Sequence, residues 1–126
     1  MTAGEVPDGY HSVNARIVVA DVAAMVGFLR SVFEATGEVA ADRPAEVRIG
    51  DSVVLVSAAG ERDAFPAFLY LYVDDADTTH ARAVAAGARS VEEPFDTPYG
   101  DRRGMVRDRF GNIFHIAHRA AGAISQ

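Results

Sequence analysis

Residues 13–37 read VNARIVVADVAAMVGFLRSVFEATG, and this stretch decides the fold because its pattern occurs twice in the chain. Its first eight residues are mostly apolar and rich in Val and Ile, which is typical of a strand. Asp21 follows as a predicted N-cap, and apolar residues then recur at spacings of three and four up to Gly37, which is expected to end the helix. The stretch therefore predicts a strand followed by an amphipathic helix.

Three short segments with strand character follow the first helix. They comprise residues 38–41, 45–49 and 52–57, and the last two are separated by Gly50-Asp51, which predicts a tight hairpin. Residues 58–66 are polar and rich in turn formers, and we interpret them as a connection between two halves of one domain.

The second half repeats the order of the first. Residues 68–87 read FLYLYVDDADTTHARAVAAG, which predicts a strand, capping aspartates and a helix that ends at Gly87. Further strands are expected at residues 90–93, 104–107 and 112–118, with a long loop at 94–103 and a turn at 108–111. Each half thus reads βαβββ, which predicts an α+β fold in which two half-sheets enclose a cleft.

Composition limits the function classes. The chain has 126 residues, which is the size of one domain, and a formal net charge of −6, with Arg as its only strongly basic residue type. An acidic chain without a basic stripe does not favour nucleic acid as a partner. The absence of Cys excludes disulfides and thiolate metal sites, and no signal peptide or membrane span is predicted, so a cytoplasmic protein is the default expectation.

Motifs in both halves are more specific than the repeat. Residues 71–77 read LYVDDAD and residues 106–112 read VRDRFGN. With IVVAD at 17–21 and FLRSVF at 28–33, they resemble the vicinal oxygen chelate superfamily, which contains glyoxalase I, bleomycin-resistance proteins and extradiol dioxygenases, and most closely its small PhnB-like glyoxalase-type members. The family usually has proline where Arg109 stands in this chain.

The resemblance implies an architecture and a site. Two βαβββ modules, here residues 12–57 and 67–118, would form a curved, mostly antiparallel sheet around a cleft, and such proteins commonly form homodimers. Metal-dependent members hold a divalent ion with four inward-facing side chains. Transferred to this sequence, the four positions carry Asn14, Leu55 (or Val54 with a one-residue slip), Phe68 and His115. Because only the imidazole is a good ligand, we expect no metal and no other cofactor.

Strand alternation predicts what the cleft face contains. Residues two apart on a strand share a face, so packing of Leu69, Leu71 and Val73 on a helix leaves three aromatic residues on the other side. These aromatic residues form either a core or a platform for a planar ligand. The candidate ligand-binding residues are Asn14, Arg16, Phe68, Tyr70, Tyr72, Tyr99, Arg102 and His115.

Several candidates have a structural alternative. Arg16 on an inward-facing strand needs either an acidic side chain or an anionic ligand as its partner. Tyr99 and Arg102 lie in the long loop, which resembles the family's gate over the cleft; otherwise Asp101 and Arg102 pair locally. His115 is a structural residue, a hydrogen-bonding group or a general base. The other histidines, His11, His80 and His118, are interpreted as surface groups.

Two functions from different classes follow from these expectations. The first is a binding protein of the drug-sequestering, antibiotic-resistance kind that holds a hydrophobic or aromatic compound in a cleft without a metal. The second is a glyoxalase-like lyase or isomerase, or a dioxygenase, either metal-dependent with unusual ligands or metal-free with His115 as the base. A purely structural partner domain is a third possibility.

Overall fold

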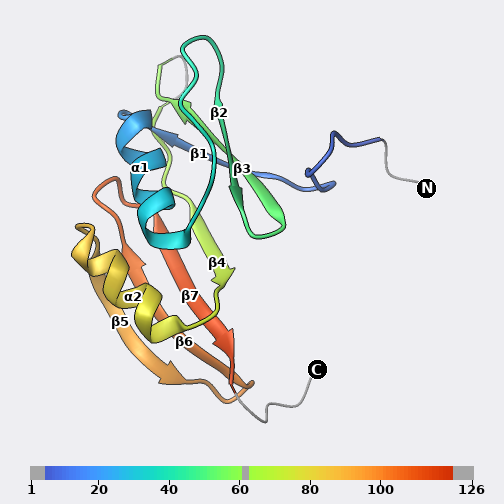
Figure 1. Ribbon diagram of the computed structural model, residues 1–126. Coiled ribbons are helices and arrows are strands. Elements are labelled where there is room, and N and C mark those ends of the chain that lie inside the picture. The colour runs from blue at the N-terminus through green and yellow to red at the C-terminus, as the bar shows by residue number, and fades with distance from the viewer. Residues whose placement is uncertain (1–4, 61–62, 121–126) are drawn as a thin grey trace. The chain divides into compact units, whose positions relative to one another are not determined.

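The computed structural model of the protein describes residues 5–60 and 63–120, and these residues form two helices and seven strands. The chain divides into two compact units that meet in sequence between Phe65 and Pro66. Figure 1 shows the elements of each unit. The α+β fold class predicted from the sequence is confirmed, whereas a cleft between the two modules stays a prediction.

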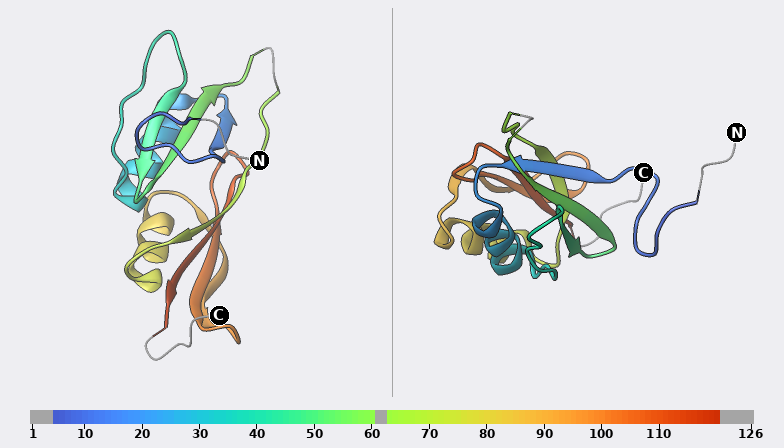
Figure 2. Two further views of the ribbon diagram at one scale, coloured as in Figure 1. Left: turned by 90° about the vertical axis from the view of Figure 1, so that its right-hand side faces the viewer. Right: turned by 90° about the horizontal axis from the view of Figure 1, so that it is seen from above.

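The first unit is a three-stranded mixed sheet with one helix. In the sheet order β1-β3-β2, β1 pairs with β3 in parallel and β2 pairs with β3 antiparallel. The helix buries its apolar side against one face of this sheet, as Figure 2 shows from above. The core contains Ile17, Val47 and Val56, each fully buried. The elements are β1 (Ala15–Val19), α1 (Val22–Phe33), β2 (Ala45–Ile49) and β3 (Ser52–Ala58).

Helix α1 begins as predicted and ends earlier than predicted. Asp21 is its N-cap and accepts a hydrogen bond from the Ala24 backbone N–H. The helix stops at Phe33 because Glu34 adopts a left-handed conformation, with φ of 56°, and its N–H bonds to the Leu29 carbonyl. Gly37 is needed for a different reason: a Cβ there would lie 2.3 Å from the Glu46 carbonyl oxygen.

Replacing Glu34 by glycine is expected to stabilise the protein. Glycine adopts the left-handed conformation without the steric cost that a Cβ brings, so we expect the free energy of unfolding to rise by about 0.5–1 kcal/mol. Urea unfolding followed by circular dichroism measures the change. Glu34→Ala is the control, since it removes the same carboxylate and keeps the Cβ. A glycine variant no more stable than the alanine variant would contradict the prediction.

The strand predicted at residues 38–41 is not formed. In its place a single bridge joins Thr36 to Arg48, with backbone hydrogen bonds of 3.1 and 2.8 Å. The segment contributes one large apolar side chain, Val39, which is half exposed, and Glu38 is drawn to Arg30 at 3.0 Å. The segment therefore has too little apolar surface to pack as a fourth strand. The first unit has three strands where four were expected.

The second unit is a four-stranded mixed sheet with helix α2 on one face (Figure 2, left). In the order β4-β7-β6-β5, β4 and β7 are parallel and the other two pairs are antiparallel. Asp75 is the N-cap of α2, as predicted, and accepts from the Thr78 N–H. The elements are β4 (Phe68–Tyr72), α2 (Ala76–Ala85), β5 (Arg89–Asp96), β6 (Asp101–Arg107) and β7 (Ile113–Arg119).

The long loop predicted at residues 94–103 is wrong. Strand β5 continues to Asp96 and β6 begins at Asp101, so only a four-residue turn separates them. Pro94 fits inside β5 because β5 is an edge strand and the β5–β6 register shifts between Glu92 and Phe95. The segment is a β-hairpin, and its role as a gate stays a prediction.

The turn between β6 and β7 is built around two buried polar side chains. One Asp108 carboxylate oxygen accepts from the backbone N–H groups of Phe110 and Asn112, each at 2.9 Å. The other carboxylate oxygen accepts from the side-chain NH2 group of Asn112 at 2.9 Å. The side-chain oxygen of Asn112 accepts from the Ala67 N–H at 2.8 Å. Asn112 thereby ties the turn to the residue that precedes β4.

Among the described residues, neither helix is long and apolar enough to cross a membrane.

Candidate functional site

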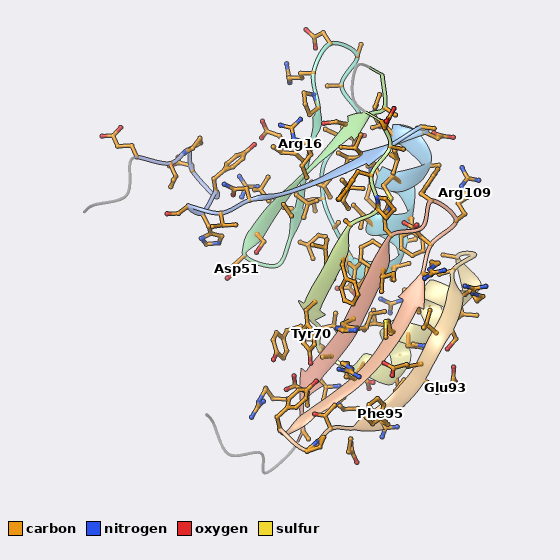
Figure 3. The ribbon with its side chains drawn as sticks, turned by 180° about the vertical axis from the view of Figure 1, so that it is seen from behind. Arg16, Asp51, Tyr70, Glu93, Phe95 and Arg109 are labelled. Carbon is orange, nitrogen blue, oxygen red and sulfur yellow. The ribbon has the colours of Figure 1, made fainter. Side chains whose placement is uncertain are left out.

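A row of aromatic side chains lies on the face of the second sheet opposite α2. Phe68, Tyr70 and Tyr72 alternate along β4 and keep 63%, 39% and 60% of their surface exposed. Figure 3 shows Tyr70 projecting from this face. Large aromatic side chains that stay open to solvent on one sheet face are available to a ligand. Together with His115 we call these residues the aromatic face.

His115 lies at the centre of the aromatic face. It is the register partner of Tyr70 across the β4–β7 pair. The rings of Phe68 and Tyr70 meet its imidazole edge to face, with centroid distances of 5.0 and 5.1 Å. Burial lowers the pKa of His115 below its ordinary value of 6.5, and the positive charge of Arg103 lowers it further against a smaller opposing effect of Glu92. The imidazole is therefore neutral at neutral pH.

The titration of His115 tests this environment. We expect its NMR-detected midpoint to fall below 6.5. Because the folded-state pKa is the lower one, the unfolded chain binds more protons between that pKa and 6.5. The stabilising contribution of the neutral ring is thus complete above this window and is lost as pH falls through the folded-state pKa. His115→Gln, which assigns the signal, should flatten this part of the stability profile. A midpoint at or above 6.5 would contradict the prediction.

A buried carboxylate fixes the tyrosines of the aromatic face. Asp101 is 1% exposed, and one of its oxygens accepts from the hydroxyls of Tyr70 and Tyr72 at 2.6 and 2.9 Å. The other oxygen accepts from Arg119 at 2.8 Å. Burial by itself raises the pKa of Asp101, but the hydrogen bonds from Tyr70, Tyr72 and Arg119 outweigh it and leave the pKa below its ordinary value. The ionised carboxylate holds both phenol rings in place.

A second polar group continues the face toward β5. The Arg103 guanidinium bonds to Glu92 at 3.0 Å, donates to the Tyr99 hydroxyl at 2.9 Å and lies 5.2 Å from the Phe95 ring centroid. The hydroxyl oxygens of Tyr99 and Tyr70 are 3.5 Å apart. Tyr99, a candidate from the sequence, is thereby joined to the aromatic face.

Sequence reasoning missed Asp101 and Arg103 as parts of the site. The signal that could have found them is the alternation along residues 101–107, which places both on the face of His115 once β6 is recognised as a strand. The predicted loop hid this alternation.

Arg102 points to the other face of β6. Its guanidinium donates to both carboxylate oxygens of Asp77 at 3.0 Å and to Asp96 at 3.4 Å. The hydrogen bond from Arg102 is the main reason that the pKa of Asp77 lies below its ordinary value. The expected local pair of Asp101 and Arg102 is wrong, because adjacent strand residues face opposite ways. A ligand contact by Arg102 stays a prediction.

One histidine assignment is also wrong. His80 is not a surface group: it is 4% exposed on the packed side of α2, and its Nε2 lies 3.1 Å from the Ser90 hydroxyl. Its spacing from the buried Ala76 and Ala83 is helical, so periodicity alone could have predicted the burial. His118 faces away from the aromatic face, as predicted, and its Nδ1 accepts from the Ala76 N–H at 2.8 Å.

Two candidates lie in the first unit. Asn14 precedes β1, and its amide forms two hydrogen bonds with the backbone of His11, at 2.6 and 3.0 Å. Arg16 is exposed on β1 and donates to the Ser57 hydroxyl at 2.7 Å. The described part of the chain offers Arg16 no carboxylate partner. Phe68 and His115, in contrast, are brought together with Tyr70 in the second unit.

The donor set at the four positions implied by the resemblance does not fit a divalent ion. Leu55 and Phe68 have no donor atom, and the Asn14 amide is engaged with His11. Within residues 5–60 and 63–120, no group of three or more His, Cys, Asp and Glu side chains could hold a metal. That the protein uses no cofactor stays a prediction.

Comparison with known proteins agrees with this fold. TioX from Micromonospora sp. ML1 is 25% identical, with a TM-score of 0.71 over 90% of this chain and 98% of that chain. A glyoxalase/bleomycin resistance protein/dioxygenase family enzyme from Burkholderia phytofirmans PsJN is 22% identical, with a TM-score of 0.72 over 84% of this chain and 96% of that chain.

Sequence comparison reaches the same family. A Mycobacterium tuberculosis protein named "Putative glyoxylase CFP32" is 44% identical over 48 residues, which are 38% of this chain and 18% of that protein. The family model described as Glyoxalase/Bleomycin resistance protein/Dioxygenase superfamily matches residues 10–116. Assignment to its PhnB-like subgroup stays a prediction. Because the match extends over most of the sequence, the chain belongs to the glyoxalase/bleomycin resistance protein/dioxygenase superfamily.

Proposed function

We propose that the protein binds a small, planar aromatic or hydrophobic compound on the aromatic face and sequesters it without chemical change. The observation that carries this proposal is the exposed row of Phe68, Tyr70 and Tyr72 beside His115. Aromatic rings stack on planar ligands at little entropic cost when their own positions are fixed. The superfamily name includes bleomycin resistance proteins, and a drug-sequestering role of the aromatic face is part of the proposal.

The hydrogen bonds around the aromatic face support ligand binding, because they hold its side chains in fixed positions. Asp101 fixes the hydroxyls of Tyr70 and Tyr72, so these rings lose little freedom when a ligand arrives. His115 and Tyr99 add polar atoms that can orient a carbonyl or hydroxyl group of the ligand. The proposal includes a homodimer, which the resemblance implies. Light scattering after size-exclusion chromatography measures the molar mass of the assembly.

Removing one ring tests the proposal with coumarin, a neutral planar fluorophore, as the probe. We expect Phe68→Ala to weaken coumarin binding about tenfold, because stacking on one aromatic ring is worth about 1–3 kcal/mol. Fluorescence titration gives the dissociation constant. Phe65→Ala is the matched control, since Phe65 is also exposed but lies in the first unit. Equal effects of the two substitutions, or no saturable binding, would reject the proposal.

One alternative is metal-free proton abstraction from a bound carbon acid by His115, whose imidazole contacts the rings of Phe68 and Tyr70 and whose lowered pKa leaves it unprotonated at neutral pH. Acetophenone, a planar aromatic ketone with exchangeable methyl protons, is a suitable probe. Proton NMR in D2O would detect deuterium uptake by its methyl group, and His115→Gln should abolish the protein-dependent part. Exchange no faster than in buffer would leave binding as the function.

A further inference from the structure

The first unit contains a hollow that the aromatic face does not account for. Its volume is about 780 Å³, which is within the range of small-molecule sites. The walls come from β1, the C-terminal end of β3, the start of α1, and residues 39–41, 43 and 44. All of these lie in the first unit, so the hollow is formed by that unit alone.

The side chains around the hollow divide into an apolar wall and a cationic end. The wall consists of short aliphatic groups, among them Val18, Val39 and Pro44, and it includes no aromatic ring. The cations are Arg16 and Arg43. The single lining carboxylate, Asp21, is engaged as the N-cap of α1. A planar aromatic ligand therefore finds nothing to stack on here, unlike on the aromatic face.

Arg16 is the best placed of the cations. Figure 3 shows it on the side of the first sheet away from α1. One of its terminal nitrogens donates to the Ser57 hydroxyl at 2.7 Å, which orients the guanidinium. Ser57 is neutral, and the described residues give Arg16 no carboxylate partner, so its charge is not compensated. Arg43 forms a long, exposed ion pair with its neighbour Asp42, at 3.9 Å.

We propose that this hollow binds an organic carboxylate with an aliphatic body, in the manner of a medium-chain fatty acid. The carboxylate pairs with the guanidinium of Arg16, whose fixed fork of N–H donors matches two carboxylate oxygens. The aliphatic chain lies along the valine and alanine wall, where it leaves water. Because the chain as a whole carries a net charge of −6, attraction of an anion depends on these local cations and not on the overall field.

Octanoate is the probe for this site, and octanol is its neutral counterpart. In nitrogen-15 NMR titrations we expect octanoate to shift the amide signals of Ala20, Ala40 and Ala58, which line the hollow. Octanol should bind at least tenfold more weakly, since it lacks the charge that Arg16 recognises. Arg16→Gln should weaken octanoate binding about tenfold and leave octanol binding unchanged, and Ser57→Ala should weaken octanoate binding by a smaller factor.

Arg48→Gln is the matched control, because it removes the same charge from the same unit and Arg48 does not line the hollow. The inference is overturned if Arg48→Gln weakens octanoate binding as much as Arg16→Gln does, or if octanol binds as tightly as octanoate. Shifts confined to the aromatic face would also overturn it, while leaving the proposed function intact. If Arg16→Gln fails to fold, Arg43→Gln supplies the test, with a several-fold loss expected.

Discussion

Asn112→Ala is expected to lower the free energy of unfolding by about 2–4 kcal/mol, because it leaves buried polar groups unpaired and opens a cavity. Asn112 is 1% exposed. Its amide donates to Asp108 at 2.9 Å and its carbonyl oxygen accepts from the Ala67 N–H at 2.8 Å. The substitution thus disturbs the β6–β7 turn and the start of β4 at once. Chemical denaturation followed by circular dichroism measures the loss.

The chain provides a matched control in its other asparagine. Asn14 also bonds through its amide to backbone groups, but it is exposed, so water can replace those bonds and Asn14→Ala should cost less than about 1 kcal/mol. Asn112→Asp separates the effect of the cavity from the effect of the lost hydrogen bonds. It keeps the side-chain volume and the oxygen that accepts from Ala67, but it places a second carboxylate beside Asp108. Asn112→Ala and Asn14→Ala variants of equal stability would contradict a structural role for this turn.

The repeat of strand and helix could be predicted because each copy carries its own local signals. Asp21 and Asp75 follow apolar strands and cap helices, and the structure confirms both. The predicted end of the first helix and the predicted loop at residues 94–103 were wrong, because a single local feature decides each of them. Glu34 ends α1 in a left-handed conformation that is uncommon for a residue with a Cβ. Pro94 lies inside β5, where an irregular edge register accommodates it.

The aromatic face could be predicted for a similar reason, since period-two alternation needs only the position of β4 and β7. Their register confirms that Phe68, Tyr70 and His115 come together. The ion-pair partners of charged residues could not be predicted from strand alternation alone. Four arginines of the second unit lie on β6 and β7, and only the pairing of those strands shows that Arg119 meets Asp101 while Arg102 meets Asp77.

The same difference explains why the two arginine candidates have different outcomes. The sequence makes both Arg16 and Arg102 candidate ligand-binding residues. The structure engages Arg102 with two carboxylates and Arg16 with a hydroxyl. An arginine that already has acidic partners gains less from an anionic ligand than one without them, because its charge is partly compensated. The proposed carboxylate site on the first unit therefore rests on the absence of an acidic partner for Arg16 among the described residues, which sequence alone could not establish.

Asp101→Asn is expected to lower the free energy of unfolding by about 2–3 kcal/mol and to loosen the aromatic face. The carboxylate is 1% exposed and accepts from Tyr70, Tyr72 and Arg119. An amide keeps the volume but carries no negative charge to pair with Arg119. Its NH2 group is a donor and would stand where a carboxylate oxygen now accepts hydrogen bonds, so it would lie against another donor. The half-exposed position of the Arg119 side chain reduces the loss, since water can solvate the guanidinium.

Asp96→Asn is the matched control, since Asp96 is exposed and its pair with Arg102 is long, at 3.4 Å. Two pH readouts distinguish loss of this network from a general structural defect. The folded-state pKa of Asp101 lies below its ordinary value, so its stabilising contribution is complete above that value and is lost as pH falls through the folded-state pKa; Asp101→Asn should remove this part of the acid sensitivity. Burial and the hydrogen bond to Asp101 raise the pKa of Tyr70, so absorbance at alkaline pH should show Tyr70 ionising earlier in the variant. Unchanged acid sensitivity together with an unchanged tyrosine titration would show that Asp101 does not hold the aromatic face.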